Sequence, residues 1–207
     1  MGRIRFWGFD KMIQTVSICE IQNRYGRYDK QIYENKSMIA NDELQILKTI
    51  WNFQKPINAM EIGIRKGFTA QFLIEDSPWL KTYIGVDVPC DYITSLVEQR
   101  WEVLTQKALY VKKREVLDLR VLPNGSFDLK SQDLPKLNFI FIDGDHSVKG
   151  VINDSLLAID SLDDSGVIFW HDYKNVKSVS ESLCYLQYRF NWDIKYIEGT
   201  YLCYMEK

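Results

Sequence analysis

The amino-acid sequence predicts an α/β fold with a doubly wound, mostly parallel seven-stranded sheet and an antiparallel C-terminal hairpin. Two observations predict it. Short apolar runs alternate with stretches of helical periodicity from residue 57 onward, and two short alternating runs flank Glu198-Gly199-Thr200 at the end of the chain. Strands that alternate with helices form parallel sheets, and a terminal hairpin adds one antiparallel strand.

Length and composition support a single globular core. The chain has 207 residues, of which 46% are hydrophobic and 26% charged, and its formal net charge is -2. These values are typical of one soluble domain with a small appendage, and they give no support to a nucleic-acid partner. No apolar stretch reaches the roughly 20 residues of a membrane span, and the basic N-terminus develops into no signal peptide. We therefore expect a cytoplasmic protein with reduced cysteines.

The first 40 residues differ from the rest. Residues 1–40 are rich in aromatic and charged side chains and show neither a sustained helical nor a sustained strand period, so we expect an arm or lid in front of a domain formed by residues 41–207. A helix should then begin at Asn41 or Asp42, either of which can cap it, and end before Pro56. Its buried face would consist of Leu44, Leu47, Ile50 and Trp51.

The next segment predicts a βαβ unit. An apolar run at residues 57–62 leads into a glycine-containing turn, a helix-compatible stretch at 68–75 and a second apolar run at 83–87. Helical spacing returns at residues 92–107. Residues 109–116 are a weaker candidate for a third strand, because Lys112 to Glu115 is continuously charged.

The segment 118–136 contains several turn-forming residues, and we expect it to be a long loop with at most a short helix. Residues 137–143 then predict a buried parallel strand, and the apolar positions between Val148 and Leu162 predict a helix. Gly166 should allow the chain to turn before the remaining elements begin. These are a strand at 167–170, a helix around 178–190 and the hairpin strands at 192–197 and 201–205.

Polar residues follow the predicted strands. Ligands of open α/β sheets bind beyond the carboxyl ends of the strands, which makes five residues the first candidates for a site. They are Glu61, Asp87, Asp143, His171 and Asp172.

The turn after the first core strand has features of a nucleotide site. Gly63 and Gly67 allow a sharp turn and a close ligand approach, and Thr69 near the following helix can help to hold a carboxylate. Asp87 can accept hydrogen bonds from both hydroxyls of a ribose. Only two glycines are present, however, so the full dinucleotide fingerprint is absent and a purely structural turn stays possible.

The chain has only two histidines, and both belong to the run Asp143-Gly144-Asp145-His146 or to the pair His171-Asp172. Asp143 and Asp172 can share a hard cation such as Mg²⁺, whereas His171 can complete a softer site or orient a neighbour. His146 is placed to act as a base. Alternatively, Asp145 or Ser147 caps the next helix and the histidines are ordinary polar residues.

At these motifs the sequence resembles the class I methyltransferases, and among them the metal-dependent catechol O-methyltransferase-like enzymes and the related small-molecule and sugar O-methyltransferases. The resemblance spans roughly residues 42–207 and rests on residues 61–69, Asp87, residues 142–147 and residues 166–173. It implies a Rossmann-like fold. It does not cover the N-terminal arm.

The resemblance also implies roles for the candidate residues. S-adenosyl-L-methionine would be bound by Glu61, Gly63, Arg65, Gly67, Thr69, Asp87 and Asp143, and a divalent cation by Asp143, His171 and Asp172. His146 would be the catalytic base, at a position where catechol-type relatives carry a lysine. Two positions depart from the family pattern. His171 replaces a carboxylate of the metal-dependent relatives, and Arg65 places a cation near the bound methionine moiety.

These residues predict O-methylation of a small-molecule or sugar hydroxyl with possible assistance from a metal. Two alternatives stay open. A NAD-dependent oxidoreductase on a Rossmann fold would need a fuller glycine fingerprint. A methyltransferase-like protein without catalysis would use the aromatic N-terminal arm as a contact surface.

Overall fold

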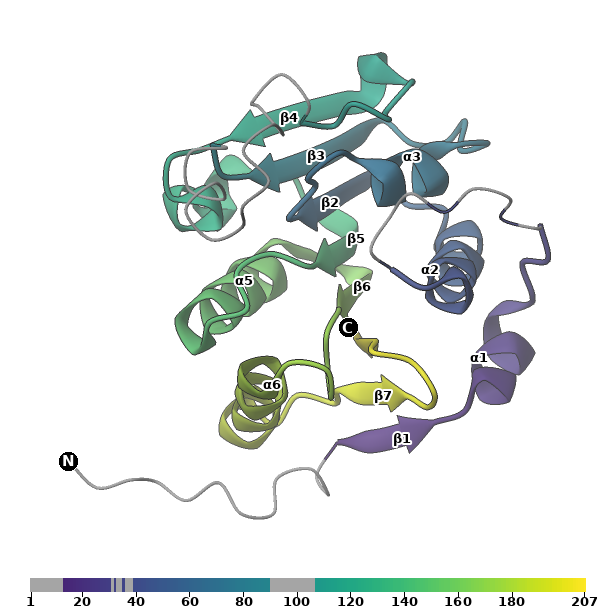
Figure 1. Ribbon diagram of the computed structural model, residues 1–207, viewed down its shortest axis with the longest axis vertical. Helices are drawn as coiled ribbons and strands as arrows, with labels where there is room; N and C mark the ends of the chain where they lie inside the picture. Colours follow the sequence, from purple (N-terminus) through teal and green to yellow (C-terminus); the bar gives the residue numbers. More distant parts are fainter. Residues whose placement is uncertain (1–12, 31, 33–34, 36–38, 90–106) are drawn as a thin grey trace.

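The computed structural model describes residues 13–30, 32, 35, 39–89 and 107–207 (Figure 1). Of the helix predicted at residues 92–107, only Lys107 belongs to the described residues. Cys90 also lies outside them. Among the described residues, no helix is long and apolar enough to cross a membrane.

The centre of the molecule is an eight-stranded sheet with the order β1-β7-β8-β6-β5-β2-β3-β4. All neighbouring strands are parallel except β8, which runs antiparallel to both β6 and β7. This arrangement confirms the predicted mostly parallel sheet with a C-terminal hairpin. The strands are β1 (Gln14–Val16), β2 (Asn58–Ile62), β3 (Thr82–Asp87), β4 (Leu117–Val121), β5 (Leu137–Ile142), β6 (Leu162–Trp170), β7 (Lys195–Ile197) and β8 (Cys203–Glu206).

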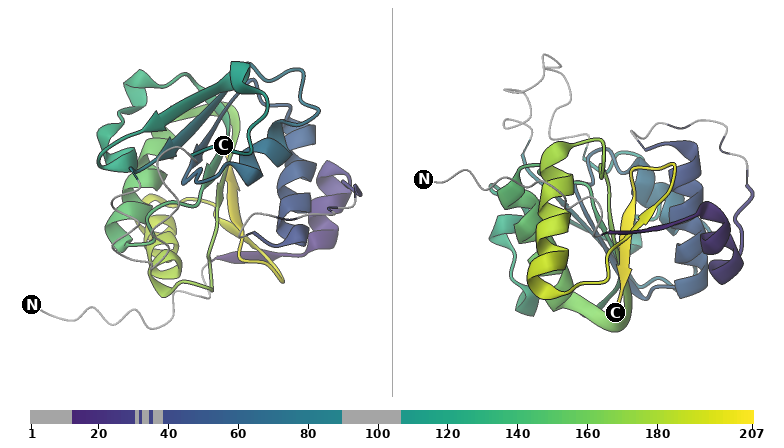
Figure 2. Two further views of the ribbon diagram at one scale, coloured as in Figure 1. Left: turned by 45° about the horizontal axis from the view of Figure 1, so that its top comes forward. Right: turned by 90° about the horizontal axis from the view of Figure 1, so that it is seen from below.

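Helices cover both faces of the sheet (Figures 1 and 2). The helices are α1 (Ile18–Tyr25), α2 (Asn41–Gln54) and α3 (Phe68–Ile74) on one face, and α5 (Val148–Ser161) and α6 (Lys177–Phe190) on the other. Strand β5 shows why both faces are apolar. Its Phe139 and Phe141 belong to the core on the α2 face and its Ile140 and Ile142 to the core on the α5 face, since successive side chains of a strand point to opposite sides.

The N-terminal segment contains more regular structure than expected. Strand β1 pairs with β7 and adds an eighth strand to the seven predicted, and α1 follows with a capping box formed by Ser17 and Glu20. Ile21 and Tyr25 of this helix are buried in the core. A strand of three residues and a helix of eight are too short to produce a sustained period, which is why the sequence pattern missed them.

Three further expectations were wrong in detail. The third strand is β4 at Leu117–Val121 rather than residues 109–116, because the charged run ends in a 3-10 turn at Arg114–Val116. Helix α2 is capped by neither Asn41 nor Asp42. Its N-cap is Ala40, whose backbone N–H donates to the Glu43 side chain. Gly166 lies inside β6 and does not begin a new strand.

Most of the predicted loop between β4 and β5 is confirmed, with two short 3-10 turns at Gly125–Asp128 and Ser131–Asp133. The buried Asp154 of α5 accepts a hydrogen bond from the Ser126 hydroxyl and thereby holds this loop against the helix.

The topology brings the carboxyl ends of four strands to one edge. Backbone hydrogen bonds run from Gly63 N to Val86 O (2.8 Å), from Asp143 N to Ile62 O (2.9 Å) and from His171 N to Ile142 O (3.0 Å). The residues that follow β2, β3, β5 and β6 are therefore neighbours in space.

Candidate functional site

The glycine turn after β2 is shaped by close contacts between backbone segments. Gly63 has a φ of +94°, and a Cβ atom there would lie 2.1 Å from the Asp143 carbonyl oxygen. Gly67 has a φ of +72°, and its Cβ would lie 2.9 Å from the Ala108 Cα atom. Both positions require glycine for packing within the protein, so the structural explanation of this turn holds whether or not a ligand approaches it.

Asp87 ends β3 and ties the turn to that strand. Its Oδ2 atom accepts a hydrogen bond from Arg65 N (2.7 Å), and its Oδ1 atom accepts one from Val88 N (2.7 Å). The Lys107 Nζ atom lies 2.7 Å from Oδ2, and both side chains are almost fully buried. Lys107 was not among the predicted site residues, because nothing in the sequence distinguishes this lysine from the other basic residues until the fold brings it to Asp87.

Glu61 and Thr69 lie deeper than expected. Glu61 is 3% exposed, and its Oε2 atom accepts a hydrogen bond from the Tyr83 hydroxyl (2.9 Å). Burial raises the pKa of Glu61 well above its usual value, and the hydrogen bond from Tyr83 opposes this shift only in part. Thr69 is 5% exposed. Both side chains are therefore almost fully buried.

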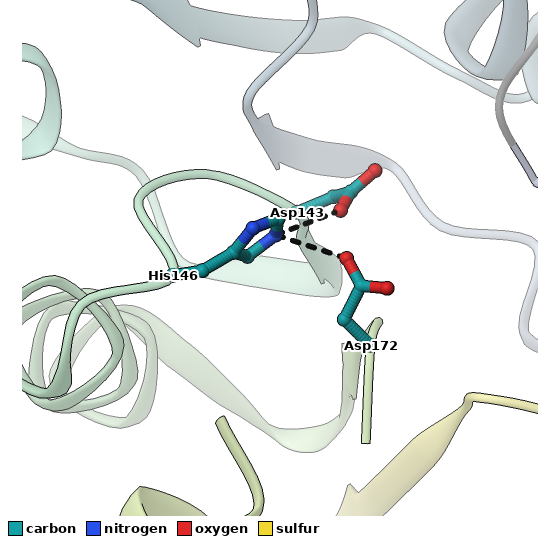
Figure 3. Close-up of side chains that lie close together, drawn as sticks. All are labelled: Asp143, His146 and Asp172. Atoms are coloured by element: carbon teal, nitrogen blue, oxygen red, sulfur yellow. Dashed lines mark ion pairs between the residues drawn. The ribbon is translucent and has the colours of Figure 1, made fainter. Parts of the chain in front are cut away.

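The strongest cluster of polar side chains forms at the ends of β5 and β6 (Figure 3). The His146 Nε2 atom lies 3.0 Å from Asp172 Oδ2 and 3.6 Å from Asp143 Oδ1. The His171 Nδ1 atom lies 3.3 Å from the same Asp143 oxygen and 3.4 Å from the same Asp172 oxygen. The fold thus brings together all four residues that the sequence singled out here. The side chain of His146 is 43% exposed, whereas that of His171 is 7% exposed.

The charges in this cluster stabilise one another. Hydrogen bonds to Asp143 and Asp172 raise the pKa of His146 to about 10. Burial works against protonation of His171, but the carboxylates of Asp143, Asp172 and Glu43 outweigh it and raise the pKa of His171 to about 12. For Asp172, burial is likewise outweighed by the two histidines, which hold its pKa far below the usual range. The carboxylates therefore favour the charged form of both histidines.

Glu43 of α2 is a further member of the site that the sequence analysis did not identify. It is 2% exposed, and its Oε2 atom lies 3.3 Å from the His171 Nε2 atom. Its capping position was hidden in the sequence, because it lies three residues after the actual N-cap, Ala40, rather than after the expected Asn41 or Asp42. Its contact with His171 joins positions 128 residues apart, and no local pattern reveals such a pair.

The cluster has the chemistry of a metal site. One potential ligand atom from each of Asp143, His146 and Asp172 lies within 4.8 Å of the other two. The predicted set had His171 in place of His146, and His171 faces the same two oxygens. Two carboxylates with imidazole nitrogens suit a divalent cation. The alternative reading of Ser147 is also correct, since its hydroxyl accepts the Gly150 N–H (3.0 Å) and caps α5. The helix cap and the cluster therefore coexist.

One protein family and several solved structures are similar to this chain. The model of one protein family, described as a methyltransferase domain, matches residues 60–173, which include Glu61, Asp87, Asp143, His146 and the His171-Asp172 pair. No curated protein matches the chain in sequence.

Several solved structures share the fold at low sequence identity. The O-methyltransferase NovP superposes with a TM-score of 0.64 at 14% identity, covering 91% of this chain and 87% of its own. An SAH-bound methyltransferase from Podospora anserina, PaMTH1, has a TM-score of 0.59 at 11% identity and covers 100% and 97% of the two chains. The O-methyltransferase of Bacillus cereus, solved in complex with SAH, has a TM-score of 0.56 at 14% identity, with 84% of each chain covered. At this identity the likeness shows the fold alone.

Proposed function

This chain belongs to the family of methyltransferase domains, and we propose that it transfers the methyl group of S-adenosyl-L-methionine to a hydroxyl oxygen of a small molecule or sugar. The observation that carries the proposal is the convergence of Asp87, Asp143, His146 and the His171-Asp172 pair at one edge of the sheet. A cofactor site, a cation site and a base would then share one crevice. The family argues against the nicotinamide-dependent alternative.

The residues around the glycine turn fit the cofactor, with one condition. We place the ribose of S-adenosylmethionine at Asp87 and its methionine part near the turn and the end of β5. The residues proposed for the methionine part are Glu61, Gly63, Arg65, Gly67, Thr69 and Asp143, of which Glu61 and Thr69 are buried. A carboxylate has about four acceptor positions, and three donors already occupy Asp87: two backbone N–H groups and Lys107. The ribose hydroxyls must therefore share Asp87 with Lys107 or displace it.

The cluster fits a divalent cation, because the buried His171 Nδ1 atom faces two carboxylate oxygens and has no hydrogen-bond partner among the described residues. We propose Asp143, His171 and Asp172 as its ligands. A cation bound there would neutralise the carboxylates, lower the pKa of His146 and polarise the substrate oxygen.

We propose His146 as the base, because its imidazole is the most exposed member of the cluster. S-adenosylmethionine supplies an electrophilic methyl carbon on a positively charged sulfur. His146 Nε2 takes the proton of the acceptor hydroxyl while the hydroxyl oxygen bonds to that carbon. The carbon–sulfur bond breaks, and its electron pair stays on sulfur. Asp143 and Asp172 stabilise the protonated imidazole that results.

The direct test combines binding and turnover. We expect calorimetry to show S-adenosylhomocysteine binding and no NAD binding. We also expect transfer of a radioactive methyl group to at least one member of a panel of catechols, phenols and sugars. Binding without transfer to any acceptor would contradict the proposal and support the second candidate, a methyltransferase fold kept as an interaction protein.

A substitution tests the base. His146→Ala should lower methyl transfer by about 10²-fold or more, the usual contribution of a general base, while the affinity for S-adenosylhomocysteine stays within about twofold. Ser147→Ala is the matched control, because it removes the cap of α5 next in sequence and leaves the imidazole in place. Full activity in His146→Ala would show that the base has been misassigned.

The cytoplasmic location remains part of this proposal. Its support is chemical, since Cys19 and Cys203 are free thiols among the described residues.

A further inference from the structure

Glu43 occupies a fixed position beside the cluster. It lies in the first turn of α2, outside the segment that matches the methyltransferase family. Its Oε1 atom accepts a hydrogen bond from Tyr201 N (2.6 Å), and its Oε2 atom accepts one from Ala40 N (3.0 Å). Two backbone N–H groups from distant parts of the chain thus hold this buried carboxylate in place.

His171 must be neutral to bind a metal ion, and in the neutral ring the position of Glu43 determines which nitrogen keeps the proton. An ionised carboxylate only accepts hydrogen bonds, so the His171 Nε2 atom facing Glu43 at 3.3 Å must be the donor. The opposite nitrogen, Nδ1, then points at Asp143 Oδ1 and Asp172 Oδ2, at 3.3 and 3.4 Å. Although His171 is 93% buried, Nδ1 makes no hydrogen bond within the described part of the chain.

The two histidines differ in how firmly they are held. The ring of His171 packs edge-on against Phe141 and Tyr201, and its far nitrogen is anchored by Glu43. The side chain of His146 is 43% exposed and lies on the loop before α5. A rigid, oriented imidazole is suited to be a ligand, and an exposed one is suited to exchange a proton with a substrate.

We propose that Glu43 is a positioning residue that keeps the proton of His171 on Nε2, so that His171 binds a divalent cation through Nδ1 together with Asp143 and Asp172. His146 then stays outside the ligand set. The inference rests on the metal-assisted form of the proposed function. A nitrogen among the ligands favours first-row transition metals, so Zn²⁺ should bind more tightly than Mg²⁺.

The first measurement uses the wild-type protein and therefore does not depend on the folding of any variant. Long-range ¹H–¹⁵N NMR spectra are recorded with one equivalent of Zn²⁺. We expect the Nδ1 resonance of His171 to shift to a coordinated value and its Nε2 to retain a proton. Coordination through Nε2, or a shift confined to His146, would overturn the assignment.

The second measurement compares two glutamates with the same place in a capping box. Glu43→Gln introduces an amide group that cannot accept all three hydrogen bonds, and loss of such an outer partner weakens metal affinity about 10–100-fold. Glu20→Gln is the matched control, because Glu20 accepts the Ser17 N–H (2.7 Å) at the start of α1 and is exposed. We expect Glu43→Gln to weaken Zn²⁺ binding by that factor and Glu20→Gln to leave it unchanged. Equal affinity in both variants would contradict the positioning role.

The outcomes separate this inference from the proposed function. If S-adenosylhomocysteine binds and Zn²⁺ binds in another mode, only the inference fails. If Zn²⁺ binds through Nδ1 and S-adenosylhomocysteine does not bind, the inference stands and the methyl-transfer proposal fails. If the wild-type protein binds no Zn²⁺, the inference fails together with metal assistance, and the cofactor assignment is judged by calorimetry alone.

Discussion

At the residue scale, the site is built from charges that partner one another inside the protein. Asp87 faces the buried Lys107, and Asp143 and Asp172 face the two histidines. A buried charge that has lost its partner is far less stable than a buried pair. Substitutions in this site therefore affect folding as well as ligand binding, and the two effects have to be separated by design.

Asp87 offers such a separation. Asp87→Ala should lower the free energy of unfolding by about 3–5 kcal/mol, because it leaves the Lys107 ammonium buried and unpaired. The double variant Asp87→Ala/Lys107→Met should recover most of that loss but still bind S-adenosylhomocysteine weakly. Urea unfolding and calorimetry measure the two quantities. Normal cofactor affinity in the double variant would show that Asp87 acts only in folding.

At the element scale, the turns after the strands decide where the site residues lie. The turn after β2 passes so close to the end of β5 that its first glycine faces the Asp143 backbone. The 3-10 turn at Arg114–Val116 shifts the start of β4 beyond the charged run. Packing between neighbouring strands, rather than the local sequence, sets these positions.

Alanine substitutions at two glycines with positive φ test the close contact between Gly63 and the Asp143 backbone. Gly63→Ala should lower the free energy of unfolding by at least about 3 kcal/mol, because its Cβ would meet the Asp143 carbonyl in addition to the backbone strain. Gly199→Ala is the control. Its φ is +82° with no atom within 4 Å, so it should show only the strain, about 1–2 kcal/mol. Equal losses in urea unfolding would show that the Asp143 contact contributes nothing.

At the scale of the whole molecule, the N-terminal segment is packed as part of the core. Val16, Ile21 and Tyr25 are buried together with residues of α2 and the sheet. Arg24 of α1 forms an ion pair with Glu206 of β8 (2.6 Å), which links this helix to the sheet. The described part of residues 1–40 is thus attached to the sheet. The division of the chain at residue 40 and the role of a lid remain predictions.

Attachment of this segment has a consequence for unfolding. Ile21→Ala should lower the free energy of unfolding by about 2–4 kcal/mol and shift the whole transition, with tryptophan fluorescence and circular dichroism still coinciding. Cys19→Ala on the exposed side of the same helix should change it by less than about 0.5 kcal/mol. An unchanged transition in Ile21→Ala would show that α1 is a separate arm.

The alternation of strands and helices, the terminal hairpin and the polar residues after each strand could all be predicted from the amino-acid sequence. These features are readable because they depend on local periodicity and on the rule that parallel strands end at one edge. Both histidines of the chain belong to the predicted cluster for this reason.

The partners of the site residues and of the edge strand could not be predicted, because they depend on how distant elements pack together. Glu43 reaches His171 across 128 positions, Lys107 reaches Asp87, and β1 joins the sheet beside β7. Each contact is made by side chains or edges that look ordinary in sequence and become specific once distant elements pack together. A local pattern indicates which roles a residue can have, whereas the burial and charge of its neighbours determine its protonation and its partners.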